Sequence, residues 1–360
     1  MSALVIGGQK AGDHTWNDFD VIDELQQDDK KTLLMRLKKN GDVFIVERLI
    51  YIDEEKKIIA EEYVQMLIQS QSEYSQHLFE FFIDENDLCI IMEYYPNGNL
   101  RDLITIEMKN MPLKEKKTIA YKYGYQMLMC LSVLYKKKIV HHQLKPENIL
   151  IDKDQNVKLA NFGPSFKSEG KLNIPSTETQ IYQSPESHTS KINIWTLGVI
   201  MLELITGVHP FSGKKNEDTI QNIIAGKMSP LPSYIRGDLK EMIFWMLNQD
   251  PNKRPSAEQV LEIDIMQVIA KIEKDNEQKI KDLEMEKQKI ILEKEWIVSE
   301  KEICQKKAVA SELQISNLTE EISKLNYQVS ILNKEQIKNE LINTTQEMEP
   351  NQTLTSTSML

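Results

Sequence analysis

Cysteine is scarce in this chain of 360 residues, which contains only Cys89, Cys130 and Cys304. These three are odd in number and far apart, and they have no metal-ligand spacing, which excludes a zinc site and a disulfide framework. They are typical of reduced thiols, so the sequence predicts a cytoplasmic protein with no structural metal.

A basic excess and a long apolar run are also missing. The formal net charge of -11 provides no electrostatic footprint for nucleic acid and disfavours anionic membrane surfaces. The first residues lack the basic start and apolar stretch of a secretory signal. The most apolar later run, 194–208, is interrupted by Glu203 and is too short for a membrane span. It predicts a buried helix, and the sequence as a whole predicts protein partners.

Glycine is absent after Asp264 and proline is absent from there to Pro350, which favours one long helix. Apolar residues recur there in steps of three and four, beginning at Ile280, although lysine occupies three of the early seam positions. From residue 315 the a positions are Ile315, Ile322 and Val329 and the d positions are Leu318, Leu325 and Leu332. This combination favours a parallel two-stranded coil. We predict a dimeric coiled coil over 265–343 and a disordered tail over 344–360.

The first part of the chain has a different texture. Short apolar runs from Phe19 onward, with Asn40-Gly41 between two of them, predict strands and a hairpin. Residues 58–70 have helical spacing, and two more strand-like runs follow. From Asn97 amphipathic helices predominate, as in the stretch 114–138. Residues 1–18 are polar and are expected to be loose.

Three local motifs appear in order along this region. They are HHQLKPEN at 141–148, NFG at 161–163, and SPE at 184–186, followed by an arginine at 254. The series resembles the catalytic loop, metal-binding loop and large-lobe landmarks of eukaryotic protein kinases, whose patterns are H-R-D-L-x-x-x-N and D-F-G. A kinase domain followed by a coil is similar to the NEK group. The resemblance implies an α+β two-lobed kinase-like fold over 19–264, with a β-rich small lobe (about 19–93) and a helical large lobe (about 94–264).

The departures from the family pattern fall on charged positions. Glu47 stands where the family has the lysine that contacts phosphates, Gln143 replaces the catalytic aspartate, and Asn161 replaces the aspartate that binds magnesium. An amide is not a useful general base. The glycine-rich loop positions are occupied by Gln26, Asp28 and Lys31, and Ile45 replaces a small alanine beside the adenine.

Other family positions are retained. The resemblance matches His141 and Phe162 to a spine that joins the lobes, with Met66 and Leu78 as further members. It matches Glu62, with Glu61 as an alternative, to the helix glutamate whose lysine partner is missing; Glu62 could equally be a solvated helix charge. It matches Lys145 and Asn148 to active-site residues, which would either keep a phosphate or metal contact or, as we favour, only shape their loop. Structural matches are Gly163, Trp195 in the central helix, and the ion pair Glu186–Arg254.

These substitutions predict a pseudokinase: a catalytically inactive, dimeric scaffold or allosteric binding protein that needs no cofactor and holds no metal. One alternative is an atypical serine/threonine kinase with weak ATP-dependent phosphotransfer. It would use ATP and magnesium with displaced groups, a lysine among Lys30, Lys31 and Lys38 and a carboxylate from Asp152 or Asp154. Another alternative is a structural coiled-coil protein with a passive kinase-like head.

Overall fold

The computed structural model of the chain describes residues 4–27, 30–162, 177–186 and 191–346. It divides into two compact units, residues 1–275 and 276–360. Gly163, Asp28 and the tail from 347 onward lie outside the described residues. Among the described helices, none is long and apolar enough to cross a membrane. Cys89 and Cys130 are buried free thiols and Cys304 is exposed.

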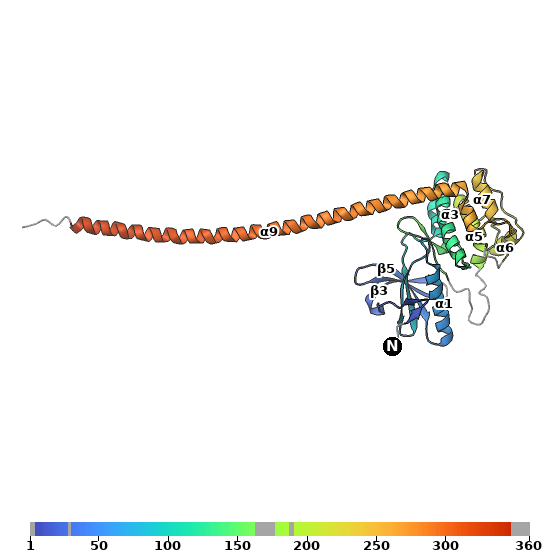
Figure 1. Ribbon diagram of the computed structural model, residues 1–360, viewed down its shortest axis with the longest axis horizontal. Helices are drawn as coiled ribbons and strands as arrows, with labels where there is room; N and C mark the ends of the chain where they lie inside the picture. Colours follow the sequence, from blue (N-terminus) through green and yellow to red (C-terminus); the bar gives the residue numbers. More distant parts are fainter. Residues whose placement is uncertain (1–3, 28–29, 163–176, 187–190, 347–360) are drawn as a thin grey trace, which may run out of the picture. The chain divides into compact units, whose positions relative to one another are not determined.

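The first unit contains a five-stranded antiparallel sheet in the order β3-β4-β5-β7-β6. Figure 1 shows this sheet with β3 and β5 labelled. The strands are β3 (Phe19–Gln27), β4 (Lys30–Leu37), β5 (Val43–Ile50), β6 (Leu78–Asp84) and β7 (Asp87–Glu93). Gly41, with φ of +82°, lies in the predicted hairpin turn between β4 and β5. One face of the sheet packs around Phe19, Met35 and Val46.

The other face of the sheet packs against α1 (Glu54–Ser70). Asp53 caps this helix by accepting a hydrogen bond from Lys56 N at 2.9 Å, which satisfies one of the free donors of its first turn. The buried face of α1 consists of Ala60, Tyr63, Val64, Leu67 and Ser70.

Residues 4–18, expected to be loose, are ordered in the structure. They form the short strands β1 (Val5–Ile6) and β2 (Gln9–Lys10) around a glycine turn. Ile6 is buried, Gly12 N donates to Phe81 O at 2.9 Å, and His14 Nδ1 lies 2.6 Å from Glu80 Oε1. This segment is ordered because α1 and β6 supply the apolar and polar surfaces that it covers.

The rest of the first unit is mainly helical. Its longer helices are α3 (Leu113–Lys136), α5 (Ile192–Thr206), α6 (Asn216–Ile224), α7 (Asp238–Met246) and α8 (Ala257–Leu261). Shorter helical segments are α2 (Leu100–Asp102), α4 (Thr177–Gln180), Trp16–Asp18, Leu103–Glu107, Met108–Asn110 and Pro146–Asn148. The strands β8 (Ile149–Ile151) and β9 (Val157–Leu159) form a small hairpin. A β-rich part followed by a helical part agrees with the predicted two-lobed kinase-like fold.

The apolar run predicted to be a buried helix is α5, which is buried from Ile192 to Ile205. It packs against α3 and α7, and it ends at Gly207, whose φ of +75° suits a residue without a Cβ. The helix α9 (Asp264–Gln346) is continuous over 83 residues, as the absence of glycine and proline predicted. Its described side chains after Asn276 are exposed, apart from the half-buried Glu277.

Candidate functional site

The predicted catalytic loop lies between α3 and β8, and His141 anchors it. His141 is 3% exposed, its Nε2 lies 3.0 Å from Ala160 O, and its ring meets Phe162 edge-on at 4.9 Å between centroids. Burial lowers the pKa of His141 to about 4, because the charged imidazolium would lose its hydration. The Asn193 side chain, with its amide turned to satisfy both groups, donates to His141 O (2.7 Å) and accepts from His141 N (3.0 Å).

Three amide side chains meet at the centre of this loop. Asn161 Nδ2 donates to Gln143 Oε1 at 3.0 Å and lies 3.5 Å from Asn148 Oδ1. Asn148 Nδ2 in turn donates to Gln143 O at 2.7 Å. Asn161 has a positive φ of 59°, a conformation that asparagine tolerates better than most residues. The structure therefore brings together three side chains from a stretch whose two ends, Gln143 and Asn161, are 18 residues apart in the sequence.

Lys145 belongs to the same loop, and its side chain is 14% exposed. Its Nζ lies 3.9 Å from Glu178 Oε2 in α4. Of the two carboxylates considered as replacements, Asp152 accepts hydrogen bonds from Asp154 N and Asn156 N in the turn between β8 and β9, and Asp154 is exposed in that turn. Among the described residues, no group of three histidine, cysteine or carboxylate side chains could hold a metal ion.

On the small-lobe side, Glu47 lies in β5 and is 5% exposed. It forms a hydrogen bond with Tyr63 of α1, and burial together with the charge of Glu47 and this bond raises the pKa of Tyr63 well above its ordinary value. Thr32 is opposite Glu47 in the ladder, and its buried Oγ1 has no hydrogen-bond partner among the described residues. Thus β5 and α1 are joined by a glutamate and a tyrosine.

This arrangement corrects the predicted alignment of α1 by one residue. Glu62, expected to face Glu47, is exposed, and Tyr63 occupies that place. Met66, expected in the spine, is half-buried and packs against the main core cluster, and its neighbour Leu67 is 1% exposed. Leu67 belongs to the same core cluster as Leu78 and Phe162. The family resemblance selected Glu62 for this place, whereas the apolar spacing of α1 includes Tyr63.

The remaining residues predicted to belong to the nucleotide site are Gln26, Asp28, Lys31 and Ile45, and those that the structure describes lie in strands of the sheet. Ile45 of β5 is half-buried, pairs with Met92 of β7 and packs against the main core. Lys31 is exposed at the start of β4 and pairs with Gln26 of β3 in the ladder. Asp28 lies outside the described residues.

In the large lobe, Arg254 donates through Nη2 to Glu186 Oε2 at 3.0 Å and through Nη1 to Oε1. The Arg254 side chain is fully buried, with its guanidinium 5.2 Å from the centre of the Trp195 ring. Burial opposes ionisation of Glu186, but the hydrogen bonds and charge of Arg254 lower the pKa of Glu186 overall. The structure therefore brings these three sequence-predicted positions together.

A second, partly buried network was not predicted from the sequence. Arg101 donates to Glu147 Oε1 and to Glu203 Oε1, both at 2.8 Å, and the Tyr182 hydroxyl donates to Glu203 Oε2 at 2.6 Å. Burial, reinforced by the charge of Glu203, raises the pKa of Tyr182. Glu203 could have indicated this network from the sequence, because a carboxylate inside an apolar helix needs a buried partner.

The comparisons with known proteins agree with this geometry. The family model described as "Protein kinase domain" matches residues 33–266. The chain belongs to the protein kinase family. This confirms the resemblance at the level of the superfamily.

Several curated kinases are similar to this chain. An Aurora kinase of Schizosaccharomyces pombe is 32% identical over 189 residues, covering 51% of this chain and 52% of that kinase. A probable serine/threonine-protein kinase of Dictyostelium discoideum is 34% identical over 192 residues, covering 51% of this chain and 38% of the relative. Aurora/IPL1-related protein kinase 2 of Caenorhabditis elegans is 25% identical over 283 residues, covering 76% and 91%. The alignment thus spans about half or less of the first two relatives.

These findings correct one prediction. The expectation that the chain is not an enzyme is wrong, because the family match and the curated relatives are protein kinases. The expectation of no cofactor has no support for the same reason. The substitutions at Glu47, Gln143 and Asn161 thus describe an unusual kinase site.

Proposed function

We propose that the chain is an atypical serine/threonine protein kinase that transfers phosphate from ATP slowly. The observation that carries the proposal is the catalytic loop, where Lys145 and Asn148 are retained beside the amide cluster of Gln143 and Asn161. A kinase accelerates phosphoryl transfer mainly by positioning its reactants and neutralising charge. A loop that keeps its shape can therefore retain part of the rate when individual carboxylates are replaced.

The residues present fit ATP and magnesium in part. Asn148 and Asn161 offer amide oxygens, which magnesium accepts although it prefers carboxylates, and Lys145 offers a positive charge for the transferred phosphate. Bound magnesium would neutralise charge on the phosphates. Glu47 does not fit, because its carboxylate occupies the family position of a phosphate-binding lysine.

Each residue of the site then has a limited role. Lys145 attracts the phosphate, and the hydrogen bonds from Asn148 and Asn161 to Gln143 hold the loop in place. Gln143 can orient a substrate hydroxyl through its amide but cannot retain the proton. General base catalysis typically contributes roughly 10²–10⁴-fold, so we expect transfer to be slower than in a typical kinase by a factor of this order.

Phosphate transfer from radiolabelled ATP to the chain itself and to a general acceptor protein, in magnesium and in manganese, tests this function. The wild-type protein should exceed a Lys145→Ala variant. Asn161→Asp should raise the rate, because it restores a carboxylate for the metal without changing side-chain shape. Asn86→Asp, at an exposed site in the turn between β6 and β7, makes the same chemical change elsewhere and should have no effect. Transfer equal to that of the Lys145→Ala variant, with no gain from Asn161→Asp, would disprove the proposal.

We also propose that α9 forms a parallel coiled coil with a second copy of the chain. The six predicted seam residues, which alternate between branched a positions and leucine d positions, are all between 52% and 64% exposed in the single chain. A helix of 83 residues that carries such an apolar seam over residues 315–332 is stabilised when the seam is buried. Two catalytic domains on one coil would engage a partner with increased effective concentration.

Sedimentation of the full chain at micromolar concentration tests the dimer. The double substitution Leu318→Asp and Leu325→Asp places charge in the seam and should produce a monomer. Ser316→Asp and Ser323→Asp add the same charge at the two positions that directly follow the a residues Ile315 and Ile322, outside the seam, and that protein should remain dimeric. A monomeric wild-type chain, or equal loss in both double variants, would disprove dimerisation through this seam.

A further inference from the structure

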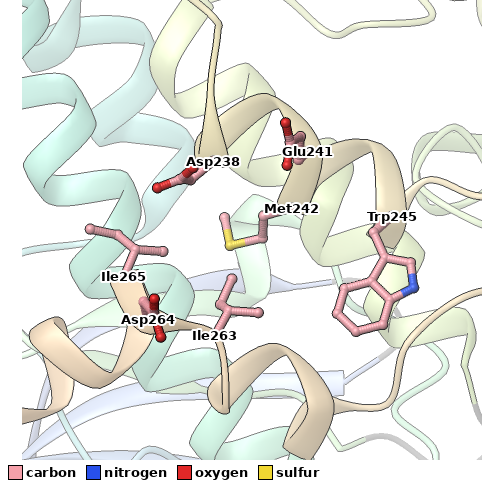
Figure 2. A pocket seen from close by; sticks show the side chains of 7 residues that line it. All are labelled: Asp238, Glu241, Met242, Trp245, Ile263, Asp264 and Ile265. Carbon is pink, nitrogen blue, oxygen red and sulfur yellow. The ribbon is translucent and has the colours of Figure 1, made fainter.

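A cavity of about 580 Å³ lies in the first unit, between α7 and the segment that leads into α9 (Figure 2). Its volume is within the range of about 300–1,000 Å³ that is usual for ligand sites. The helix α7 contributes Asp238, Glu241, Met242 and Trp245, and the second segment contributes residues 263–265. None of these residues belongs to the catalytic loop or to the predicted seam.

The floor of the cavity is apolar. Met242 and Ile263 point toward one another across its centre, with Trp245 on one side and Ile265 on the other (Figure 2). Trp245 is held in place by its indole N–H, which donates to Lys253 O at 3.1 Å. A rigid aromatic wall beside aliphatic side chains suits one bulky apolar group, since such a group gains free energy when it leaves water.

The rim of the cavity is acidic. Asp238, Glu241 and Asp264 are exposed, and none of the three forms an ion pair within the described part of the chain. The nearby Lys240 lies over the ring of Phe244, with 5.5 Å from its Nζ to the ring centre. Three unpaired carboxylates around an apolar floor attract a ligand that is both apolar and basic, and repel anionic lipid surfaces.

The apolar floor continues along α9. Val268 and Ile272 are 53% and 47% exposed, and they follow Ile265 at helical spacing, so they share its face. The predicted seam, extended backward in the same steps, would pass through Met266 and Glu273, which are buried against the first unit. Ile265 packs against the core at the edge of the cavity, whereas neither the seam nor the core accounts for the exposed residues Val268 and Ile272 that continue its stripe.

We propose that this cavity is a docking site for a segment of a partner protein that carries a bulky apolar side chain flanked by arginine or lysine. The apolar side chain enters between Met242, Ile263 and Trp245. The basic side chains pair with the acidic rim, and the rest of the segment follows Val268 and Ile272. The negative net charge of the chain, -11, favours the approach of such a segment. This inference is independent of the proposed phosphotransfer.

Selection of random short peptides displayed on phage, with the full chain as bait, tests the site. We expect the wild-type protein to enrich peptides that combine a bulky apolar residue with neighbouring basic residues. The triple variant Asp238→Asn, Glu241→Gln and Asp264→Asn should not enrich them. A matched control, Glu115→Gln, Glu217→Gln and Glu262→Gln, removes three exposed carboxylates that do not line the cavity and should behave as the wild type does.

Binding of an enriched peptide, synthesised with a fluorescent label, then tests the acidic rim and the apolar floor separately. Its affinity should fall at least about tenfold, or about 1.4 kcal/mol, in the triple variant. It should also fall in Ile265→Asp, although that change adds negative charge, because it disrupts the apolar floor. Thermal unfolding of each variant checks that the fold is kept. Enrichment of no peptide, equal weakening in the matched control, or tighter binding to Ile265→Asp would overturn the docking site.

Discussion

Replacing Glu47 by glutamine should increase the affinity of the chain for ATP. Glu47 is 5% exposed in β5, at the position where the family has a phosphate-binding lysine. The substitution removes the negative charge while the side-chain amide oxygen can still accept a hydrogen bond from Tyr63. The Tyr63 contact and the packing around β5 are therefore expected to remain, so the change in affinity reports the charge.

The expected magnitude follows from the Coulomb energy. Two unit charges about 4 Å apart interact by about 4 kcal/mol at an effective dielectric constant near 20, and by about half as much at twice the distance. Taking the larger distance, loss of the Glu47 charge should improve binding by about 2 kcal/mol, which corresponds to about 30-fold in the dissociation constant.

Calorimetric titration of ATP with magnesium at neutral pH measures this effect. Glu62→Gln is the matched control, because Glu62 is exposed on α1 one position from Tyr63 and its charge is screened by water. We expect it to change the affinity by less than about twofold. Unchanged affinity in Glu47→Gln, or an equal gain in Glu62→Gln, would refute the assignment of Glu47 to the phosphate side of the site.

Two further predictions concern stability. Arg254→Met leaves the Glu186 carboxylate without its buried partner and should cost about 3–5 kcal/mol in the free energy of unfolding measured with urea. The double variant with Glu186→Gln should recover part of this loss, and an equal or greater loss would contradict the pairing. His141 has a pKa of about 4 in the folded chain against about 6.5 when unfolded, so the unfolded chain takes up the proton first as the pH falls. Stability should therefore be complete above pH 6.5 and decline by about 3 kcal/mol toward pH 4, and His141→Phe should reduce this slope.

Several features could be predicted because their determinants are local. The turn at Gly41, the buried helix α5 and the uninterrupted helix α9 all follow from residue types within one element. The catalytic loop could be identified in the same way, since His141 and Asn148 belong to one contiguous motif. Local sequence also revealed which charged positions differ from the family pattern.

The catalytic inactivity that we predicted from those positions is wrong, because the family match and the curated relatives are protein kinases. The residues Gln143 and Asn161 show that two carboxylates of the family pattern are missing. The family match, in contrast, depends on the whole of residues 33–266. Kinase catalysis depends on the arrangement of many groups, so individual residue types do not determine whether the reaction is retained.

Tertiary structure decided which side chains meet. On α1 the family resemblance matched Glu62 to the residue that faces β5, and packing against the sheet placed Tyr63 there instead. The network of Arg101 and Glu203 joins residues 102 positions apart, and the acidic cavity joins α7 to the start of α9. No local pattern specifies such pairs, because each forms only when separate elements pack and remove their polar groups from water. The sequence by itself thus determined the elements and the catalytic motif, and packing determined their partners.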